Sequence, residues 1–141
     1  MTDADLVRKR LAFIETCLRE LAELSDSRRI EHDVRERRFV EHTLQIAIQA
    51  TLDVASHIVA SDRLGEPTTN QSLFQILERA GWVTPELAAE LRGMAGFRNV
   101  LVHGYVAVDP AIVRDVLECR LGDIEAFVES IRERLDDVSP Q

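Results

Sequence analysis

The segment from Gly96 to Tyr105 holds the residues of this sequence whose types and spacing suit chemistry. It reads GFRNVLVHGY and places Arg98, Asn99, His103 and Tyr105 in an apolar run that should face the core or an interface. A buried guanidinium is costly unless an anion pairs with it. Arg98 therefore needs a carboxylate of the protein or the phosphate of a ligand.

His103 lies at the expected end of a helix, just before Gly104. The helix dipole favours a protonated imidazole there, so His103 could act as an acid near neutral pH. Arg98 and His103 are five residues apart, which is about 140° around a helix and roughly 7.5 Å along it. They need not touch within one chain, but a twofold dimer would bring two of each to a shared cleft.

Such a set suits the cleavage of RNA. One group takes the proton of the 2′-hydroxyl, another protonates the leaving oxygen, and a guanidinium stabilises the charge that develops on phosphorus. This chemistry requires no metal, and we expect no cofactor or metal site. A purely structural role remains an alternative, with Arg98 paired to Asp53 or another acid and His103 hydrogen-bonded at the helix end. In the catalytic interpretation, Asp53 supports Arg98 by orienting it.

The hydrophobic residues recur with helical period through almost the whole chain. A first helix, capped by Thr2 or Asp3, carries one apolar stripe, formed by Val7, Leu11, Ile14, Leu18 and Leu21. A second helix is expected from about Ser27 to Ser61. Its first part is charged and its second part is apolar over a wide arc, which is typical of the central helix of a bundle.

Turn and capping residues divide the rest of the chain. Residues 62–69 form a loop, and Asn70 caps a short helix that Gly81 ends. Thr84 followed by Pro85 starts a helix that continues through Arg98 to about Val102. Asp109 followed by Pro110 starts one last long helix, whose apolar stripe is Val113, Leu117, Leu121, Ile124, Val128, Ile131 and Leu135. The sequence thus predicts an all-α fold, an antiparallel four-helix bundle with one short extra helix, as a single domain over residues 1–141.

The charge balance limits the partners. The 141 residues include 25 acidic and 17 basic side chains, for a net charge of −8, which argues against a wide electrostatic surface for nucleic acid. All the basic residues except Lys9 are arginines, which suit bidentate phosphate contacts. Five of them fall within residues 28–38, where we expect RNA contacts outside the cleft. The longest uncharged stretches, about eleven residues, are too short to span a membrane, and without a visible signal segment we expect a cytoplasmic protein.

The arrangement Arg98-Asn99-x3-His103-x-Tyr105 matches the Arg-x4-His-x-Tyr motif of the HEPN superfamily, as found in HepT-type toxins. The similarity extends over nearly the whole chain. Residues 53–60, DVASHIVA, resemble the family's second helix, and residues 74–105 resemble its central segment.

This resemblance implies a HEPN-like bundle and a homodimeric, metal-independent ribonuclease whose substrate is transfer or messenger RNA. By position, Arg98 and His103 take the catalytic roles, and Asn99 is the polar residue after the arginine. The resemblance also implies a partner, a minimal nucleotidyltransferase antitoxin of the MntA type that silences the toxin by transferring AMP to the tyrosine of the motif. Tyr105 occupies that position.

Three other functions are weighed. A di-iron site needs Glu-x-x-His pairs, and none of the four histidines has a glutamate three residues before it. A DNA-binding helix-turn-helix would use residues 71–80, where Glu78 disfavours it. The serious alternative is a non-catalytic HEPN module that binds a nucleotidyltransferase partner.

Overall fold

A computed structural model describes residues 2–103 and 108–138 of the chain. Within them the regular elements are α1 (Ala4–Leu24), a 3₁₀ helix η1 (Ser27–Arg29), α2 (Val34–Ser61), α3 (Asn70–Arg79), α4 (Pro85–His103), α5 (Pro110–Cys119) and α6 (Leu121–Val138). The described part of the chain contains no strand. The all-α prediction is therefore confirmed.

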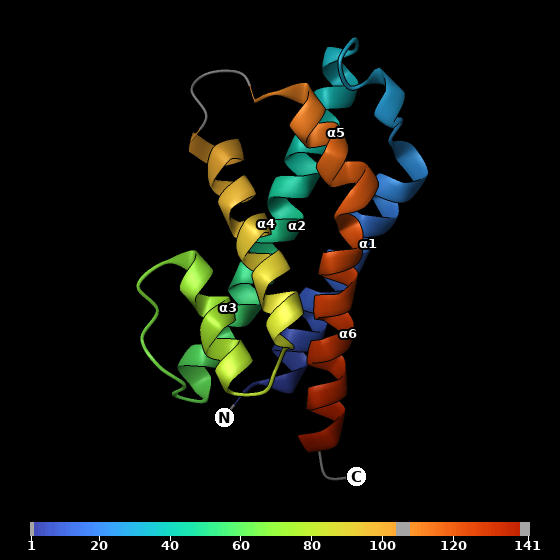
Figure 1. Ribbon diagram of the computed structural model, residues 1–141. Helices are drawn as coiled ribbons and strands as arrows, with labels where there is room; N and C mark the ends of the chain where they lie inside the picture. The colour runs from blue at the N-terminus through green and yellow to red at the C-terminus, as the bar shows by residue number, and fades with distance from the viewer. Residues whose placement is uncertain (1, 104–107, 139–141) are drawn as a thin grey trace.

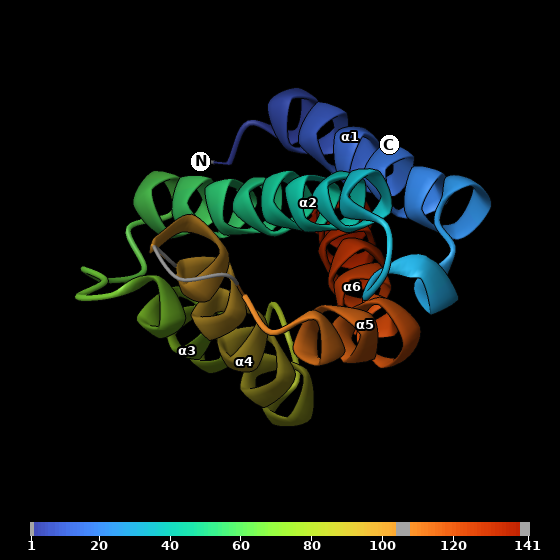
Figure 2. The same cartoon turned by 90° about the horizontal axis from the view of Figure 1, so that it is seen from above.

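The central helix of the bundle is α2, as its wide apolar arc predicts. It lies between α1 on one side and α3, α4, α5 and α6 on the other (Figures 1 and 2). Its buried residues occur on both predicted faces; they include Val40, Leu44, Ile48, Leu52, Val54, Ala55, Ile58 and Val59. One cluster of buried apolar side chains draws on all six α-helices. This shared core fixes the position of α4, which carries the motif.

The second helix begins later than predicted. The carboxylate of Asp33 accepts the backbone N–H groups of Arg35 and Glu36 at 2.9 and 3.3 Å and caps α2, so residues 27–33 are not part of it. Asp26 similarly caps η1. An aspartate that accepts backbone N–H groups competes with helix continuation, which is why helical periodicity alone placed the start too early.

The predicted last helix is two helices, α5 and α6, which meet at Arg120. This residue has φ −116° and ψ −6°, which depart from the angles of a regular α-helix, and its side chain donates a hydrogen bond to Glu90 of α4 at 2.8 Å. Gly122, a poor helix former, lies two residues further on. The bend lets α5 contact η1 while α6 continues along α1 (Figure 1).

The short helix α3 and the start of α4 follow the predicted turn signals. Thr69, one residue before the predicted Asn70, caps α3 in a reciprocal pair with Ser72. Gly81 has φ +82°, the left-handed conformation expected after a helix. Thr84 Oγ1 accepts the N–H of Leu87 at 3.1 Å and caps α4 as predicted. None of the described helices is both long enough and apolar enough to cross a bilayer.

Candidate active site

The C-terminal end of α4 extends beyond the packing of the bundle. The buried residues of α4 are Ala88, Leu91, Met94, Ala95 and Phe97, and none follows Phe97. Leu101 is only partly buried against the core, whereas Val100 and Val102 are 51% and 39% exposed. A rigid helix therefore presents Arg98, Asn99 and His103 at the edge of the fold.

Arg98 is half-buried and forms no ion pair with any described residue. Its Nη1 donates a hydrogen bond to Asn99 Oδ1 at 3.3 Å, and its Nε is buried without a partner. A buried donor without an acceptor costs free energy until an acceptor binds. The Arg98 guanidinium is thus held by Asn99 and is not neutralised by any described carboxylate.

The structure does not support the predicted pairing of Asp53 with Arg98. Asp53 Oδ1 instead accepts a hydrogen bond from Gln49 Nε2 at 2.9 Å, and Oδ2 lies 3.7 Å from Arg10 Nη1 of α1. Asp53 therefore lies on the side of α2 that faces α1. Both the supporting role of Asp53 and the simple structural alternative for Arg98 lose their geometric basis.

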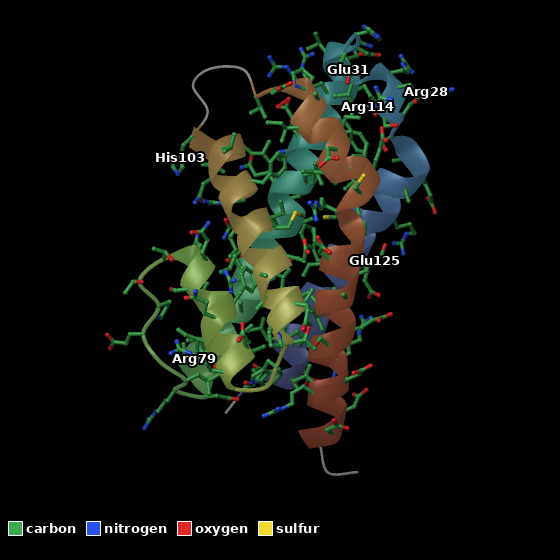
Figure 3. All side chains as sticks on the ribbon, in the orientation of Figure 1. Arg28, Glu31, Arg79, His103, Arg114 and Glu125 are labelled. Carbon is green, nitrogen blue, oxygen red and sulfur yellow. The ribbon has the colours of Figure 1, made fainter. Side chains whose placement is uncertain are left out.

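His103 is exposed in the last turn of α4 and points away from the bundle (Figure 3). Its ring makes no hydrogen bond or ion pair with the described residues, so it is accessible to a substrate. Positions 98 and 103 differ by about 140° around the helix axis, so Arg98 and His103 point in different directions from α4. A single described chain does not bring the two side chains together on one face.

Tyr105, the third residue of the motif, lies outside the described residues, as does Gly104. Asn99 is exposed and contacts Arg98 as described above. Among residues 2–103 and 108–138, no group of three or more His, Cys, Asp or Glu side chains is placed to hold a metal ion.

Two features beside the motif were missed by the sequence analysis. Ala89, Gly96 and Val100 share a face of α4 with His103, and this face has no covering helix at Val100. Gln71 of α3 donates a hydrogen bond to the carbonyl of Arg92 at 3.4 Å, and a Cβ on Gly96 would lie 3.3 Å from Gln71 Nε2. The i, i+4 and i+7 spacing of the small residues Ala89, Gly93 and Gly96 was the available signal for the first feature. The second depends on tertiary packing.

Comparisons with known proteins agree with this fold and identify nuclease relatives. The chain is 29% identical over 91% of its length to the mRNA nuclease HepT of Shewanella oneidensis, and the match covers 97% of that protein. It is 34% identical over 67% of its length to the tRNA nuclease HepT of Aphanizomenon flos-aquae, across 65% of that protein.

Solved structures show the same fold. A tri-AMPylated Shewanella oneidensis HEPN toxin in complex with its MNT antitoxin matches with a TM-score of 0.84 and 28% identity, over 94% of this chain and 99% of that one. The cytosolic protein YutE of Bacillus subtilis, at 19% identity and a TM-score of 0.88 over 99% of this chain and 96% of that one, shares the fold alone. The family model described as "Ribonuclease HepT-like" matches residues 14–131, so the chain belongs to the HepT-like ribonuclease family.

Proposed function

We propose that this ribonuclease is the toxin of a toxin–antitoxin pair, and that it cleaves RNA without a metal ion at a cleft between two copies of the chain. The observation that carries the proposal is the state of Arg98. Its Nε is buried without an acceptor in a chain that has 25 acidic side chains, and an exposed histidine follows five residues later on the same helix. The family membership and the nuclease relatives support the same conclusion.

The proposed chemistry assigns a role to each side chain. Arg98 binds the scissile phosphate and stabilises the negative charge that develops on its oxygens. His103 exchanges protons as the general acid or base. The 2′-oxygen loses its proton and bonds to phosphorus, and the bond to the 5′-oxygen breaks as that oxygen is protonated. The products are a 2′,3′-cyclic phosphate and a free 5′-hydroxyl. Asn99, which accepts from Arg98 Nη1, orients the guanidinium.

The divergence of Arg98 and His103 around α4 is the reason to propose a dimer. A twofold axis near the end of α4 would supply Arg98 and His103 from both copies to one cleft. Val100 is 51% exposed on the same face as His103, and a second copy would remove this apolar side chain from water. Gly93, where a Cβ would meet nothing within 4 Å, lies beside this face and would let a second α4 helix approach closely.

The proposed regulation acts on Tyr105 through an antitoxin of the minimal nucleotidyltransferase class. The tyrosine oxygen attacks the α-phosphorus of ATP, pyrophosphate leaves, and the hydroxyl proton is lost. Tyr105 is two residues beyond His103, so an AMP group there places negative charge next to the catalytic residues. The AMPylated toxin among the similar structures supports this proposal.

Cleavage of transfer and messenger RNA in the presence of a chelator tests the catalytic part. The wild-type chain is expected to cleave, and His103→Ala is expected to lower the rate at least about 100-fold, because a general acid or base contributes on this order. His32→Ala, which removes another exposed histidine, serves as the control and should cleave at the wild-type rate. Equal cleavage by the wild type and His103→Ala would refute the role of His103. No cleavage by any of the three proteins would favour the non-catalytic module.

Intact-protein mass spectrometry after co-expression with the antitoxin tests the regulatory part. The wild-type toxin should gain the mass of one or more AMP groups, and Tyr105→Phe should gain none. The chain has one tyrosine, so AMP retained by the variant would place the modification on another type of residue.

A further inference from the structure

The five arginines of residues 28–38 fall into two groups. Three are held by carboxylates: Arg28 by Asp26 at 3.1 Å, Arg29 by Asp33 at 2.5 Å and Arg37 by Glu41 at 3.9 Å. The guanidinium groups of Arg35 and Arg38 are exposed and make no ion pair or hydrogen bond with any described residue. An arginine whose charge is not neutralised by a neighbouring acid keeps its full attraction for a phosphate.

The two unpaired arginines lie on one exposed face of α2. Positions 35, 38 and 42 have the i, i+3 and i+7 spacing of a single helix face, and His42 at the third position is also exposed. The same face continues to Gln49. Between positions 46 and 53 of α2 and positions 9 and 13 of α1 there is a groove of about 380 Å³, lined by Lys9, Arg10, Phe13, Ile46, Gln49, Ala50 and Asp53.

The groove has the features of a site for a nucleobase. Phe13 is 46% exposed at its edge, although phenylalanine is usually buried. Gln49 Nε2 is fixed by Asp53, and Gln49 Oε1 is buried without a hydrogen-bond partner. Lys9, the only lysine of the chain, is exposed at the groove and pairs with no described acid.

We propose that this surface, formed by Lys9, Phe13, Arg35, Arg38, His42 and Gln49 and called here the α1–α2 surface, binds single-stranded RNA outside the catalytic motif. Arg35 and Arg38 contact backbone phosphates. One base stacks on Phe13, and its exocyclic amino group donates to Gln49 Oε1. This inference rests on the proposed RNA-cleaving function and identifies a second contact region for its substrate.

The location of the surface agrees with this role. The N-terminal part of α2 and the C-terminal end of α4 lie at the same end of the molecule (Figure 1). Arg28 and His103 mark this end in Figure 3. Since the chain carries a net charge of −8, long-range attraction of RNA is weak, and local unpaired cations must hold the strand.

Binding of a fluorescent, fully 2′-O-methylated oligoribonucleotide tests the proposal without cleavage, because this probe lacks the nucleophilic hydroxyl. Fluorescence anisotropy at several salt concentrations should show roughly tenfold weaker binding for the double variant Arg35→Gln/Arg38→Gln. The slope of log K against log salt should fall by about 1.4, the value for two lost phosphate contacts on a single strand. The matched control is Arg28→Gln/Arg29→Gln, which removes the same charge from the same segment at carboxylate-paired positions and should change neither quantity much.

A second pair of variants tests the base contact. Phe13→Ala should weaken binding about tenfold with little change in the salt slope, because stacking is not ionic. Leu24→Ala removes another exposed apolar side chain of α1, 65% exposed, and should bind as the wild type does. Circular dichroism and Tm confirm that each variant is folded.

The outcomes separate this proposal from the catalytic one. If the two arginine double variants lose the same affinity for the probe, the loss comes from the change in net charge, and the proposal is overturned. Wild-type binding by both double variants, or no binding of the probe by the wild type, would also overturn it. Cleavage of natural RNA is measured in parallel. If the RNA is cleaved but the α1–α2 surface does not bind it, this proposal alone is contradicted. RNA that is bound there but never cleaved contradicts the catalytic proposal alone.

Discussion

The most informative residue of this protein is Arg98, an arginine that forms no ion pair with a described carboxylate. Eight arginines form ion pairs with described carboxylates, as Arg132 does with both oxygens of Glu15 at 2.8 and 2.5 Å. Arg98 contacts the amide of Asn99 instead, and its Nε has no partner. A half-buried guanidinium kept without a carboxylate contributes little to folding. In the proposed mechanism it binds the scissile phosphate.

Replacement of Arg98 should therefore affect activity far more than stability. Arg98→Ala is expected to lower kcat/KM about 100-fold, the order of effect of losing one donor to a developing oxyanion. Arg98→Lys should restore only part of this loss, since an ammonium cannot reproduce the planar fork of donors. Because no ion pair is broken, the free energy of unfolding should change by less than about 1 kcal/mol. Cleavage assays and urea unfolding measure the two effects.

Arg132→Ala is the control for this prediction, because it breaks the ion pair with Glu15 far from the motif. It should retain activity. Equal activity of Arg98→Ala and Arg132→Ala would contradict the assignment of Arg98 to the active site.

At the scale of elements, links between helices hold α4 and its neighbours in place. The pair between Glu15 and Arg132 joins α1 to α6. Arg120 joins the break between α5 and α6 to Glu90 of α4 at 2.8 Å. These contacts are on the surface, so each contributes modestly, and the apolar core supplies most of the stability.

The α1–α6 link should make stability depend on acid pH. The hydrogen bond from Arg132 lowers the pKa of Glu15 below its ordinary value of 4.5. A carboxyl whose pKa is lower in the folded state stabilises the fold above its unfolded pKa, and this stabilisation disappears as the pH falls through the folded pKa. Since Glu15 is 44% exposed, we expect the contribution to be about 1 kcal/mol or less.

Chemical denaturation between pH 7 and pH 3 measures this dependence. Glu15→Gln should be less stable than the wild type at pH 7, and the difference should shrink toward pH 3. A difference that stays constant with pH would show that Glu15 acts through packing and not through its charge.

At the scale of the whole molecule, the proposed dimer can be tested on one face of α4. Gly93 and Gly122 are both exposed helical glycines, and a Cβ at either position meets nothing within 4 Å. Gly93 lies beside the α4 face of Ala89, Gly96, Val100 and His103, whereas Gly122 lies at the start of α6. The two glycines therefore form a matched pair for a test of the dimer.

Gly93→Ala and Gly122→Ala should each stabilise the isolated chain by up to about 1 kcal/mol, because alanine loses less backbone entropy in a helix. If two α4 helices pack closely, the methyl group at position 93 should also weaken the dimer, while the one at 122 should not. Sedimentation equilibrium measures the dimer constants. Identical constants for both variants would place the dimer contact away from this face of α4.

The sequence by itself determined the all-α class and the central role of α2, and it placed the candidate pair Arg98 and His103 on the helix that is α4. Periodic apolar residues and the caps at Thr84 and Asp109 are local signals, and local hydrogen bonding decides where such helices begin. The expected start at Ser27 and the single last helix were wrong. Asp33 caps α2 later, and Arg120 leaves the helical conformation where its side chain reaches Glu90.

Only the tertiary structure decided which charges of different helices are paired. The sequence suggested that Asp53 pairs with Arg98. In the structure, the packing of α1 against α2 places Asp53 beside Arg10, and Gln49 on α2 also donates a hydrogen bond to Asp53. The neutralised arginines of residues 28–38 instead pair locally, with carboxylates two or four residues away, and Arg35 and Arg38 are left unpaired. The Arg10–Asp53 pair depends on a distance of a few ångströms between residues far apart in the chain, and no local pattern encodes that distance. The structure therefore identified the unpaired cations, and with them the surfaces on which RNA is proposed to bind.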